Sequence, residues 1–256
     1  LKLSPIIRIL GTEWSALTIA GTSNKKKRLM IKNNFCISLQ EVTKTVDTPD
    51  GALDVVQNIS LNVEYSEAIV IKGASGSGKT TLLGLMAGLD QISAGEIVLL
   101  GQNLGDKSEE QRSGIRAGKV GFVFQTFQLV QGATALQNVM LPLELRGTKD
   151  AMEIADTSLQ QVGLAAKKGT LVDHLSGGEQ QRVSIARAFA VKPLILFADE
   201  PTGNLDAKTG SQIADLMFRL RDQSGTTLVL VTHESELARR VDRQILIDSG
   251  RLLDQS

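Results

Sequence analysis

The stretch Gly73-Ala74-Ser75-Gly76-Ser77-Gly78-Lys79-Thr80 decides the fold of this 256-residue chain. It matches the pattern G-x-x-x-x-G-K-[ST], and it lies between a short apolar run at 67–72 and a stretch with helical spacing at 80–89. Strand, glycine-rich turn and helix, in that order, form the context in which this pattern binds phosphate. Glycines let the backbone approach an anion closely, and the helix directs the partial positive charge of its N-terminus at the same point.

This loop is expected to supply several contacts to one nucleotide. Lys79 would reach the β- and γ-phosphates, and Thr80 would place its hydroxyl group on Mg²⁺. A glycine-rich turn with a solvated lysine is the alternative, but it does not explain the flanking strand and helix. A Rossmann dinucleotide site fails because Thr81 stands where its third glycine would be. The predicted nucleotide contacts are Gly73, Ala74, Ser75, Gly76, Ser77, Gly78, Lys79, Thr80 and Thr81.

A second motif is the run Leu194-Ile195-Leu196-Phe197-Ala198-Asp199-Glu200, an apolar strand that ends in two carboxylates. Buried carboxylates are costly unless a cation compensates them, and Mg²⁺ is the cation expected beside a phosphate-binding loop. Asp199 is therefore the predicted Mg²⁺ ligand, directly or through water. Glu200 is predicted to be the general base that polarises the attacking water. The alternative is a strand that merely ends in a solvated turn before Pro201.

The order of the predicted elements indicates an α/β fold. Residues 35–45 and 53–63 alternate apolar and polar side chains around a turn, which predicts an antiparallel hairpin. Residues 133–190 carry apolar side chains at helical spacing, which predicts a helical insertion. The remaining predicted elements are strands at 67–72, 96–100, 120–124, 194–200 and 227–231, the last being the final core strand, and helices at 80–89, 107–119 and 208–220. We therefore expect a P-loop NTPase with a RecA-like parallel sheet core, an N-terminal antiparallel β subdomain and an inserted α-helical subdomain.

A third motif, Leu175-Ser176-Gly177-Gly178-Glu179-Gln180-Gln181-Arg182, resembles the signature of ATP-binding-cassette (ABC) ATPases. Its serine and glycines would open a helix and expose free N–H groups to an anion. The chain's own P-loop already surrounds its phosphates, so a second phosphate-binding helix end is redundant within one molecule. The resemblance implies that Ser176, Gly177 and Gly178 grip the γ-phosphate of a nucleotide held by a second ABC ATPase subunit. A head-to-tail homodimer with two shared ATP sites is the implied assembly.

Other positions resemble further family motifs. Gln125 resembles the Q-loop glutamine, which senses Mg²⁺ or water, and so joins Thr80 and Asp199 as a metal contact. Asp206 resembles the D-loop aspartate near the subunit boundary. His233 resembles the switch histidine that contacts the γ-phosphate and orients the water, so Glu200, His233 and Gln125 form the implied catalytic set. We interpret His174, directly before the signature, as structural.

One family position departs from the pattern. Many ABC ATPases stack adenine on an aromatic residue ahead of the P-loop, but the corresponding stretch, 42–46, has none. Val46 would offer only apolar contact, which is weaker than an aromatic face. We therefore expect poor discrimination between ATP and GTP.

Finer motifs resemble the LolD/MacB group, closest to its YbbA-like members. They lie at 87–90, 122–125, 141–147 and 197–206. The resemblance implies a Mg²⁺-dependent ATPase, coupled to transport, that energises a separate integral membrane permease for export, extraction or mechanotransmission of an amphiphilic substrate. A non-transport ABC ATPase that signals through a membrane partner, of the cell-division or regulatory type, is the alternative. A permease helix would dock beside Phe127, Leu129, Val130, Leu136 and Val139, unless these residues are ordinary helical core.

The ABC ATPase domain is expected to cover 31–256, with the α/β core and β subdomain at 36–126 and 193–256 and the helical subdomain at 127–192. Residues 1–30 hold six basic side chains against one acidic one. We expect this segment to be a disordered basic leader, with Met30 as the functional start; a polybasic arm that touches anionic lipid is the alternative.

The charge and composition exclude several functions. Lys plus Arg and Asp plus Glu both total 28, so no overall field attracts nucleic acid. Cys36 is the only cysteine, and two histidines are too few for a zinc site. No apolar run reaches the ~20 residues of a membrane span. We expect a peripheral protein on the cytoplasmic face of the inner membrane.

Overall fold

A six-stranded sheet in the order β10-β9-β3-β8-β7-β6 lies at the centre of the computed structural model, which describes residues 34–49 and 51–255. Its strand β3 (Ala68–Lys72) is buried at every position except the last. Ala68 and Val70 pack into one apolar cluster, whereas Ile69 and Ile71 pack into the other. Successive side chains of a strand point to opposite faces, so an uninterrupted apolar run is what a sheet covered on both faces requires.

The strand directions bring the predicted motifs to one edge of this sheet. β3 pairs in parallel with both β8 and β9, and β7 pairs in parallel with β8 and β6, whereas β10 is antiparallel to β9. The strands are β6 (Val120–Phe124), β7 (Ile195–Asp199), β8 (Thr227–Val231), β9 (Arg243–Asp248) and β10 (Arg251–Gln255). Because β3, β7 and β8 run the same way, the segments that follow them meet where a parallel sheet binds ligands.

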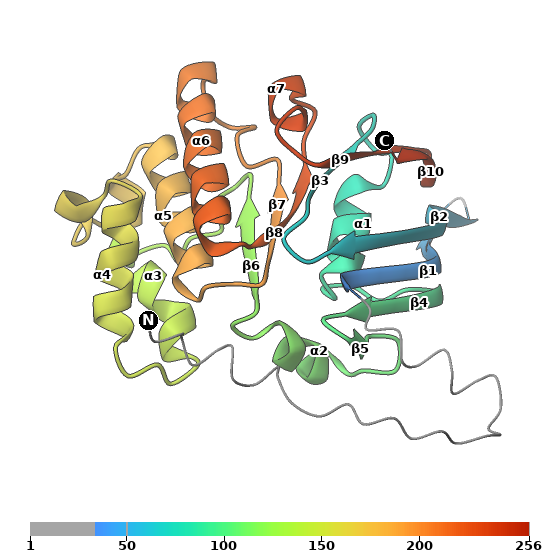
Figure 1. Cartoon of the computed structure of the whole chain (residues 1–256), viewed down its shortest axis with the longest axis horizontal. Coiled ribbons are helices and arrows are strands. Elements are labelled where there is room, and N and C mark those ends of the chain that lie inside the picture. Colours follow the sequence, from blue (N-terminus) through green and yellow to red (C-terminus); the bar gives the residue numbers. More distant parts are fainter. Residues whose placement is uncertain (1–33, 50, 256) are drawn as a thin grey trace, which may run out of the picture. The chain divides into compact units, whose positions relative to one another are not determined.

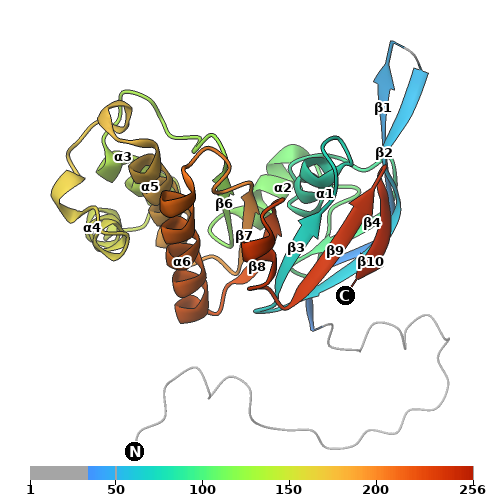
Figure 2. The same cartoon turned by 90° about the horizontal axis from the view of Figure 1, so that it is seen from above.

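Different layers cover the two faces. Figure 2 shows helices α3, α4, α5 and α6 gathered on one side of the sheet, with the β1–β2 hairpin projecting at the opposite end. Helix α1, directly after the glycine-rich loop, packs on the other face together with the antiparallel strands (Figure 1). The helices are α1 (Lys79–Met86), α2 (Glu109–Arg116), α3 (Ala135–Glu144), α4 (Ala151–Gln161), α5 (Gly177–Ala190), α6 (Ala207–Ser224) and α7 (Ser235–Ala238), with short 3-10 turns at 165–167 and 172–174.

The predicted antiparallel hairpin is confirmed and is longer than expected. β1 (Phe35–Thr48) pairs with β2 (Gly51–Glu64), and β4 (Ala94–Leu99) and β5 (Gln102–Asn103) complete a four-stranded sheet in the order β2-β1-β4-β5. The alternation that predicted the hairpin is present in β2, where Ile59, Leu61 and Val63 are buried between exposed neighbours.

The prediction that 227–231 is the final core strand was wrong. β9 follows it and joins the parallel sheet beside β3, and β10 folds back on β9. The signal in β9 was weak because only Ile245 and Ile247 are buried, with an exposed Leu246 between them. The predicted helices at 80–89 and 107–119 are present but shorter, as α1 and α2.

The residues from Asn34 onward form one compact unit. The predicted basic leader and the proposed start at Met30 lie outside the described residues. Within the described part of the chain, no helix is both long enough and apolar enough to span a membrane. The domain boundaries drawn from the sequence remain a prediction.

Candidate nucleotide-binding and hydrolysis site

The glycine-rich loop is formed by close backbone packing. Gly78, the residue before α1, has a left-handed φ of 98°, and a Cβ built on it would lie 2.5 Å from the Val55 carbonyl oxygen of β2. A Cβ on Gly73 would collide with the carbonyl of Ile247 in β9. Only glycine fits either position without displacing a neighbouring strand. The loop is therefore shaped by two strands that are distant from it in sequence.

Lys79 lies against the backbone of this loop. Its Nζ donates to the carbonyl oxygens of Gly73 at 3.0 Å and Ala74 at 2.7 Å. The N–H of Ser77 donates to the Ala74 carbonyl at 3.2 Å and tightens the same turn. These contacts hold the positively charged Lys79 ammonium group beside the N-terminus of α1. The predicted phosphate contacts require this arrangement.

Thr80 and Asp199 meet as predicted for a Mg²⁺ site. The Thr80 hydroxyl donates to Asp199 Oδ1 at 3.3 Å. Burial raises the pKa of Asp199 and the charge of Glu200 raises it further, while the Thr80 hydroxyl and Lys79 lower it. A cation would relieve this cost, and two hard oxygen donors suit Mg²⁺ when nucleotide oxygens complete its shell. The described residues contain no cluster of three or more His, Cys, Asp or Glu side chains that would hold a metal unaided.

Glu200 and His233 form a pair at the ends of β7 and β8. His233 Nδ1 lies 3.1 Å from Oε1 and 3.0 Å from Oε2 of Glu200. The Glu200 side chain is 19% exposed, whereas that of His233 is 72% exposed, so the pair reaches from the protein interior to solvent. Glu200 also has a left-handed φ of 47°, which is uncommon for a non-glycine residue and marks stored backbone strain. No sequence pattern indicated that strain.

Gln125 lies beside the D-loop. Its Nε2 donates to Asn204 Oδ1 at 3.1 Å, and Asn204 Nδ2 donates back to the Gln125 carbonyl at 3.0 Å. Gln125 follows β6, where Phe124 pairs with Asp199 across the sheet. The residue is thus next to the predicted metal ligand, with its amide group bound to the segment that begins at Glu200. Its role as a Mg²⁺ or water contact remains a prediction, and Asn204 is the partner that the sequence did not reveal.

The signature residues begin helix α5, as predicted. Ser176 is the N-cap, and its N–H donates to Glu179 Oε2 at 3.0 Å. Gly177 has room for a Cβ, whereas a Cβ on Gly178 would lie 2.5 Å from Thr209 Cγ2 of α6. The first turn of α5 therefore packs tightly on α6 while its tip stays open.

A hollow lies beside this helix tip. Asp206 caps α6 by accepting from the Thr209 N–H at 3.0 Å, and the Thr209 hydroxyl and N–H lower the pKa of Asp206. The hollow is lined by residues of the signature and of the D-loop, namely Ser176, Gly177, Gly178, Glu179, Arg182, Asn204, Leu205, Asp206, Thr209 and Gln212. The described residues of the P-loop do not line it. The structure thus brings the loop 73–80 together with Asp199, Glu200 and His233. The signature residues lie beside Asp206 instead.

The expected base platform is aliphatic. Val46 lies on β1 directly opposite Leu53 of β2, and Leu53 is 54% exposed. Two residues further along β2, Val55 contacts the P-loop through its carbonyl group. The hairpin therefore carries an apolar pair near the loop, a half-buried Val46 and an exposed Leu53, and Leu53 is the member that only the strand register reveals.

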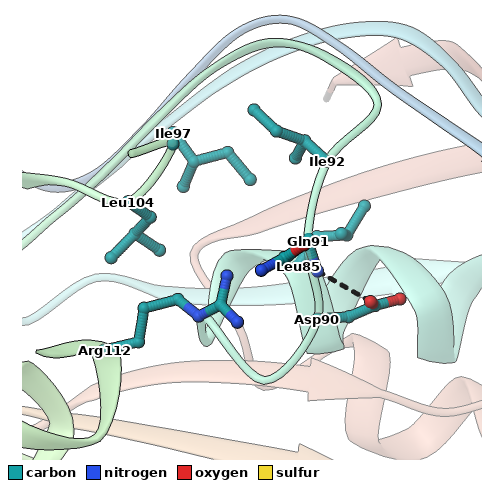
Figure 3. A pocket seen from close by; sticks show the side chains of 8 residues that line it. Leu85, Asp90, Gln91, Ile92, Ile97, Leu104 and Arg112 are labelled. Atoms are coloured by element: carbon teal, nitrogen blue, oxygen red, sulfur yellow. Dashed lines mark hydrogen bonds between the residues drawn. The ribbon is translucent and has the colours of Figure 1, made fainter. Parts of the chain in front are cut away.

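A small cavity beside α1 is structural. Figure 3 shows the cavity surrounded by Leu85 of α1, Ile97 of β4, and Ile92 and Leu104 of the adjoining segments, with the Arg112 guanidinium group pointing inward. Arg112 is almost fully buried and donates to Glu109 at 2.9 Å. The volume of about 50 Å³ is room for a few waters, which excludes a nucleotide.

Relatives with known names match nearly the whole described unit. The family model "ABC transporter" matches residues 56–203. The uncharacterized ABC transporter ATP-binding protein YbbA of Escherichia coli K12 is 46% identical over 222 residues, which cover 86% of this chain and 97% of that protein. The lipoprotein-releasing system ATP-binding protein LolD of Shewanella sp. MR-4 is 42% identical over 218 residues, covering 84% and 94%.

Solved structures agree with these relatives. The ATP-binding cassette MJ0796, a dimer in a post-hydrolysis state bound to ADP and phosphate, superposes with a TM-score of 0.80 and 36% identity, covering 86% of this chain and 97% of that one. CbiO1 of Clostridium perfringens, part of an ABC transporter complex, gives 0.76 at 26% identity, covering 88% and 89%. The predicted fold and the resemblance to the LolD and YbbA group are confirmed. This chain belongs to the ABC transporter family and is one of its ATP-binding, ATP-hydrolysing cassettes.

Proposed function

We propose that this chain is the Mg²⁺-dependent ATPase subunit that energises a separate integral membrane permease. The observation that carries the proposal is the convergence of Thr80, Asp199, Glu200 and His233 at one edge of the parallel sheet. A phosphate-binding loop, a hard-metal site and a carboxylate paired with a histidine are the parts that phosphoanhydride hydrolysis requires.

Hydrolysis would follow from these parts. The P-loop N–H groups and Lys79 would hold the triphosphate, and Thr80 with Asp199 would hold Mg²⁺, which would supply positive charge to the phosphates. Glu200 takes a proton from water as the water oxygen bonds to the γ-phosphorus and the bond to the ADP oxygen breaks. His233 keeps the Glu200 carboxylate oriented through its Nδ1 contact. A phosphate-release assay with and without Mg²⁺ tests this assignment, and turnover in excess EDTA would contradict it.

We further propose that two copies share two ATP sites, head to tail. The open tip of α5 supports this, because its free N–H groups and partial positive charge face solvent rather than a phosphate of the same chain. The γ-phosphate would then favour the closed dimer, since a ligand shifts an equilibrium only through its differential affinity. The dimer of the relative MJ0796 supports the same arrangement. Light scattering with ATP and with ADP tests it, and identical masses in both would contradict it.

The permease partner and the amphiphilic substrate are proposed from the relatives, because LolD is named for a lipoprotein-releasing system. Such a partner would place this subunit at the cytoplasmic face of the inner membrane. Of the residues predicted beside the docking groove, Leu129 and Val139 are buried in the core, while Val130 is 47% exposed. Co-purification from membranes with an untagged partner, followed by its identification, tests the proposal. Recovery of a division or regulatory protein would support the non-transport alternative.

A further inference from the structure

Gln181, in the second turn of helix α5, makes an unusual buried contact. Its side chain is fully buried, and its Nε2 donates to the carbonyl oxygen of Pro201 at 2.6 Å. Its Oε1 has no hydrogen-bond partner among the described residues. Burying an amide oxygen without a partner is unfavourable, so an apolar side chain of similar size would be expected if packing were the only requirement.

The contact matters because Pro201 lies in the turn that contains Glu200. Pro201 follows Glu200, whose left-handed backbone turns its carboxylate toward His233. The Glu200 N–H donates to Val231 at 2.9 Å, which fixes the turn on the strand side. Proline has no N–H, so its carbonyl is the only backbone group through which it forms a hydrogen bond, and Gln181 is the donor. A strained turn persists only when its surroundings hold it from several directions.

Two further contacts hold the rest of the same turn. Thr202 donates its hydroxyl to Glu234, next to His233, and Asn204 exchanges bonds with Gln125. Both partners belong to the α/β core. Gln181 alone among these three partners comes from the signature helix, which begins at Ser176 in the open hollow.

We propose that Gln181 is a positioning residue that holds Glu200 in its hydrolytic geometry and couples that geometry to the signature end of α5. The inference rests on the proposed function, in which Glu200 is the base and α5 meets a nucleotide held by a second copy. A phosphate at the α5 tip would shift this helix, and Gln181 would pass the shift to the Pro201 carbonyl. One ATP site of the dimer would thereby influence the carboxylate of the other site.

Two substitutions test the contact in the full-length chain. Gln181→Met has nearly the same size but cannot donate, and Gln181→Asn keeps an amide that is too short to reach Pro201. A matched control is Ser184→Ala on the same helix, because Ser184 is also fully buried with an unpartnered oxygen. We expect both Gln181 variants to lower kcat at least about tenfold, since small misplacements of a reacting group have large effects on rate.

Two readouts separate positioning from general damage. The KM for ATP should stay within about twofold of wild type, because the P-loop is not touched, and the Hill coefficient for ATP should fall toward one. Ser184→Ala should keep the wild-type values of kcat and Hill coefficient. If Gln181→Met does not fold, as judged by its melting curve, Gln181→Asn is measured in its place.

The outcomes distinguish this inference from the proposed function. Turnover by Glu200→Gln at the wild-type rate would overturn both. An inactive Glu200→Gln together with folded Gln181 variants of normal kcat and Hill coefficient would overturn the inference alone. A rise in KM without a change in kcat would also overturn it, because Gln181 would then affect nucleotide binding. A loss of kcat with unchanged KM and lost cooperativity supports it.

Discussion

The P-loop end and the signature end of this molecule are both built to meet phosphate, yet they differ in completeness. The P-loop end collects groups from three regions of the chain: the loop itself, the neighbours Asp199 and Glu200, and His233. The signature end presents one helix tip beside Asp206, and the described P-loop residues do not reach it. The difference supports the proposal that one chain carries most of one ATP site and contributes its signature to another.

The pKa values of Asp199 and Asp206 also differ between these two ends. Burial and the adjacent Glu200 raise the pKa of Asp199, whereas the Thr209 hydroxyl and N–H lower the pKa of Asp206. Asp206 thus finds its partners within its own chain, while Asp199 lacks enough positive charge. The raised pKa of Asp199 supports the proposal that the P-loop end binds a cation together with the nucleotide.

The largest expected effect comes from Glu200→Gln. Removing the general base should lower the rate of phosphate release by about 10² to 10⁴, while ATP still binds and stabilises the dimer. Single-turnover hydrolysis and light scattering measure the two quantities. Glu236→Gln is the control, because Glu236 is an exposed carboxylate on α7. Near-normal hydrolysis by Glu200→Gln would show that the P-loop end is assembled differently from our account.

Gly177→Asp should have the next largest effect, about 10² in rate, because a carboxylate at the α5 tip repels an incoming phosphate. The substitution fits the fold: a Cβ there lies 3.5 Å from Leu205 Cδ2, and an acidic residue favours a helix N-terminus. Gly177→Ala is the matched control and should retain activity. Unchanged hydrolysis by Gly177→Asp would show that the signature does not form part of the ATP site.

Mixing two inactive chains sharpens this prediction. Lys79→Ala should weaken nucleotide binding, which a titration measures, but it leaves the signature intact. In a mixed dimer with Gly177→Asp, one composite site contains only wild-type groups. A 1:1 mixture should therefore regain about a quarter of the wild-type rate, since half the dimers are mixed and each has one working site. No recovery would contradict head-to-tail sharing.

A smaller effect is expected from Val46→Tyr. An aromatic face adds about 0.5–1.5 kcal/mol beyond area burial, so the KM for ATP should fall by about two- to tenfold. The wild type should hydrolyse GTP at a rate close to that of ATP, because the Val46 and Leu53 pair offers only apolar contact. Far slower hydrolysis of GTP by the wild type would show that another group reads the base.

The smallest effect concerns stability. The folded chain holds the Asp199 proton to a higher pH than the unfolded chain does, so stability falls as pH rises through the window between the two pKa values. Asp199→Asn should remove this decrease in stability with rising pH. It should also raise the Tm at neutral pH by about 1–3 °C in the absence of nucleotide. Melting curves from pH 4 to 8 check it, with Asp206→Ala as a comparison. Asp206 stabilises above its unfolded pKa and loses that effect as pH falls. A lower Tm for Asp199→Asn would contradict the assignment.

The sequence predicted the elements whose pattern comes from burial on a sheet or helix. β3 and β7 are apolar because both faces are covered, and the β1–β2 hairpin alternates because one face is not. β9 was not predicted because it forms a strand by pairing with β3, which lies about 170 residues earlier in the chain. Pairing of that range is a property of the folded chain, and a local pattern does not contain it.

The candidate site was predicted in its residue types but not in its connections. The loop, Asp199 and Glu200 follow from motif and charge, and His233 follows from the family resemblance. The left-handed turn at Glu200, the buried Gln181 contact and the Gln125–Asn204 exchange do not. They depend on which backbone atoms approach one another in three dimensions.

The packing of the P-loop on β2 and β9 also has a consequence for biosynthesis. Gly250 donates its N–H to the Ser77 carbonyl at 3.0 Å, and Ile247 closes against Gly73. A nascent chain in which residues 247–250 have not yet been made lacks both of these contacts, although residues 73–80 are already translated. The loop therefore acquires its full set of backbone contacts only after β9 and the turn that follows it have been synthesised.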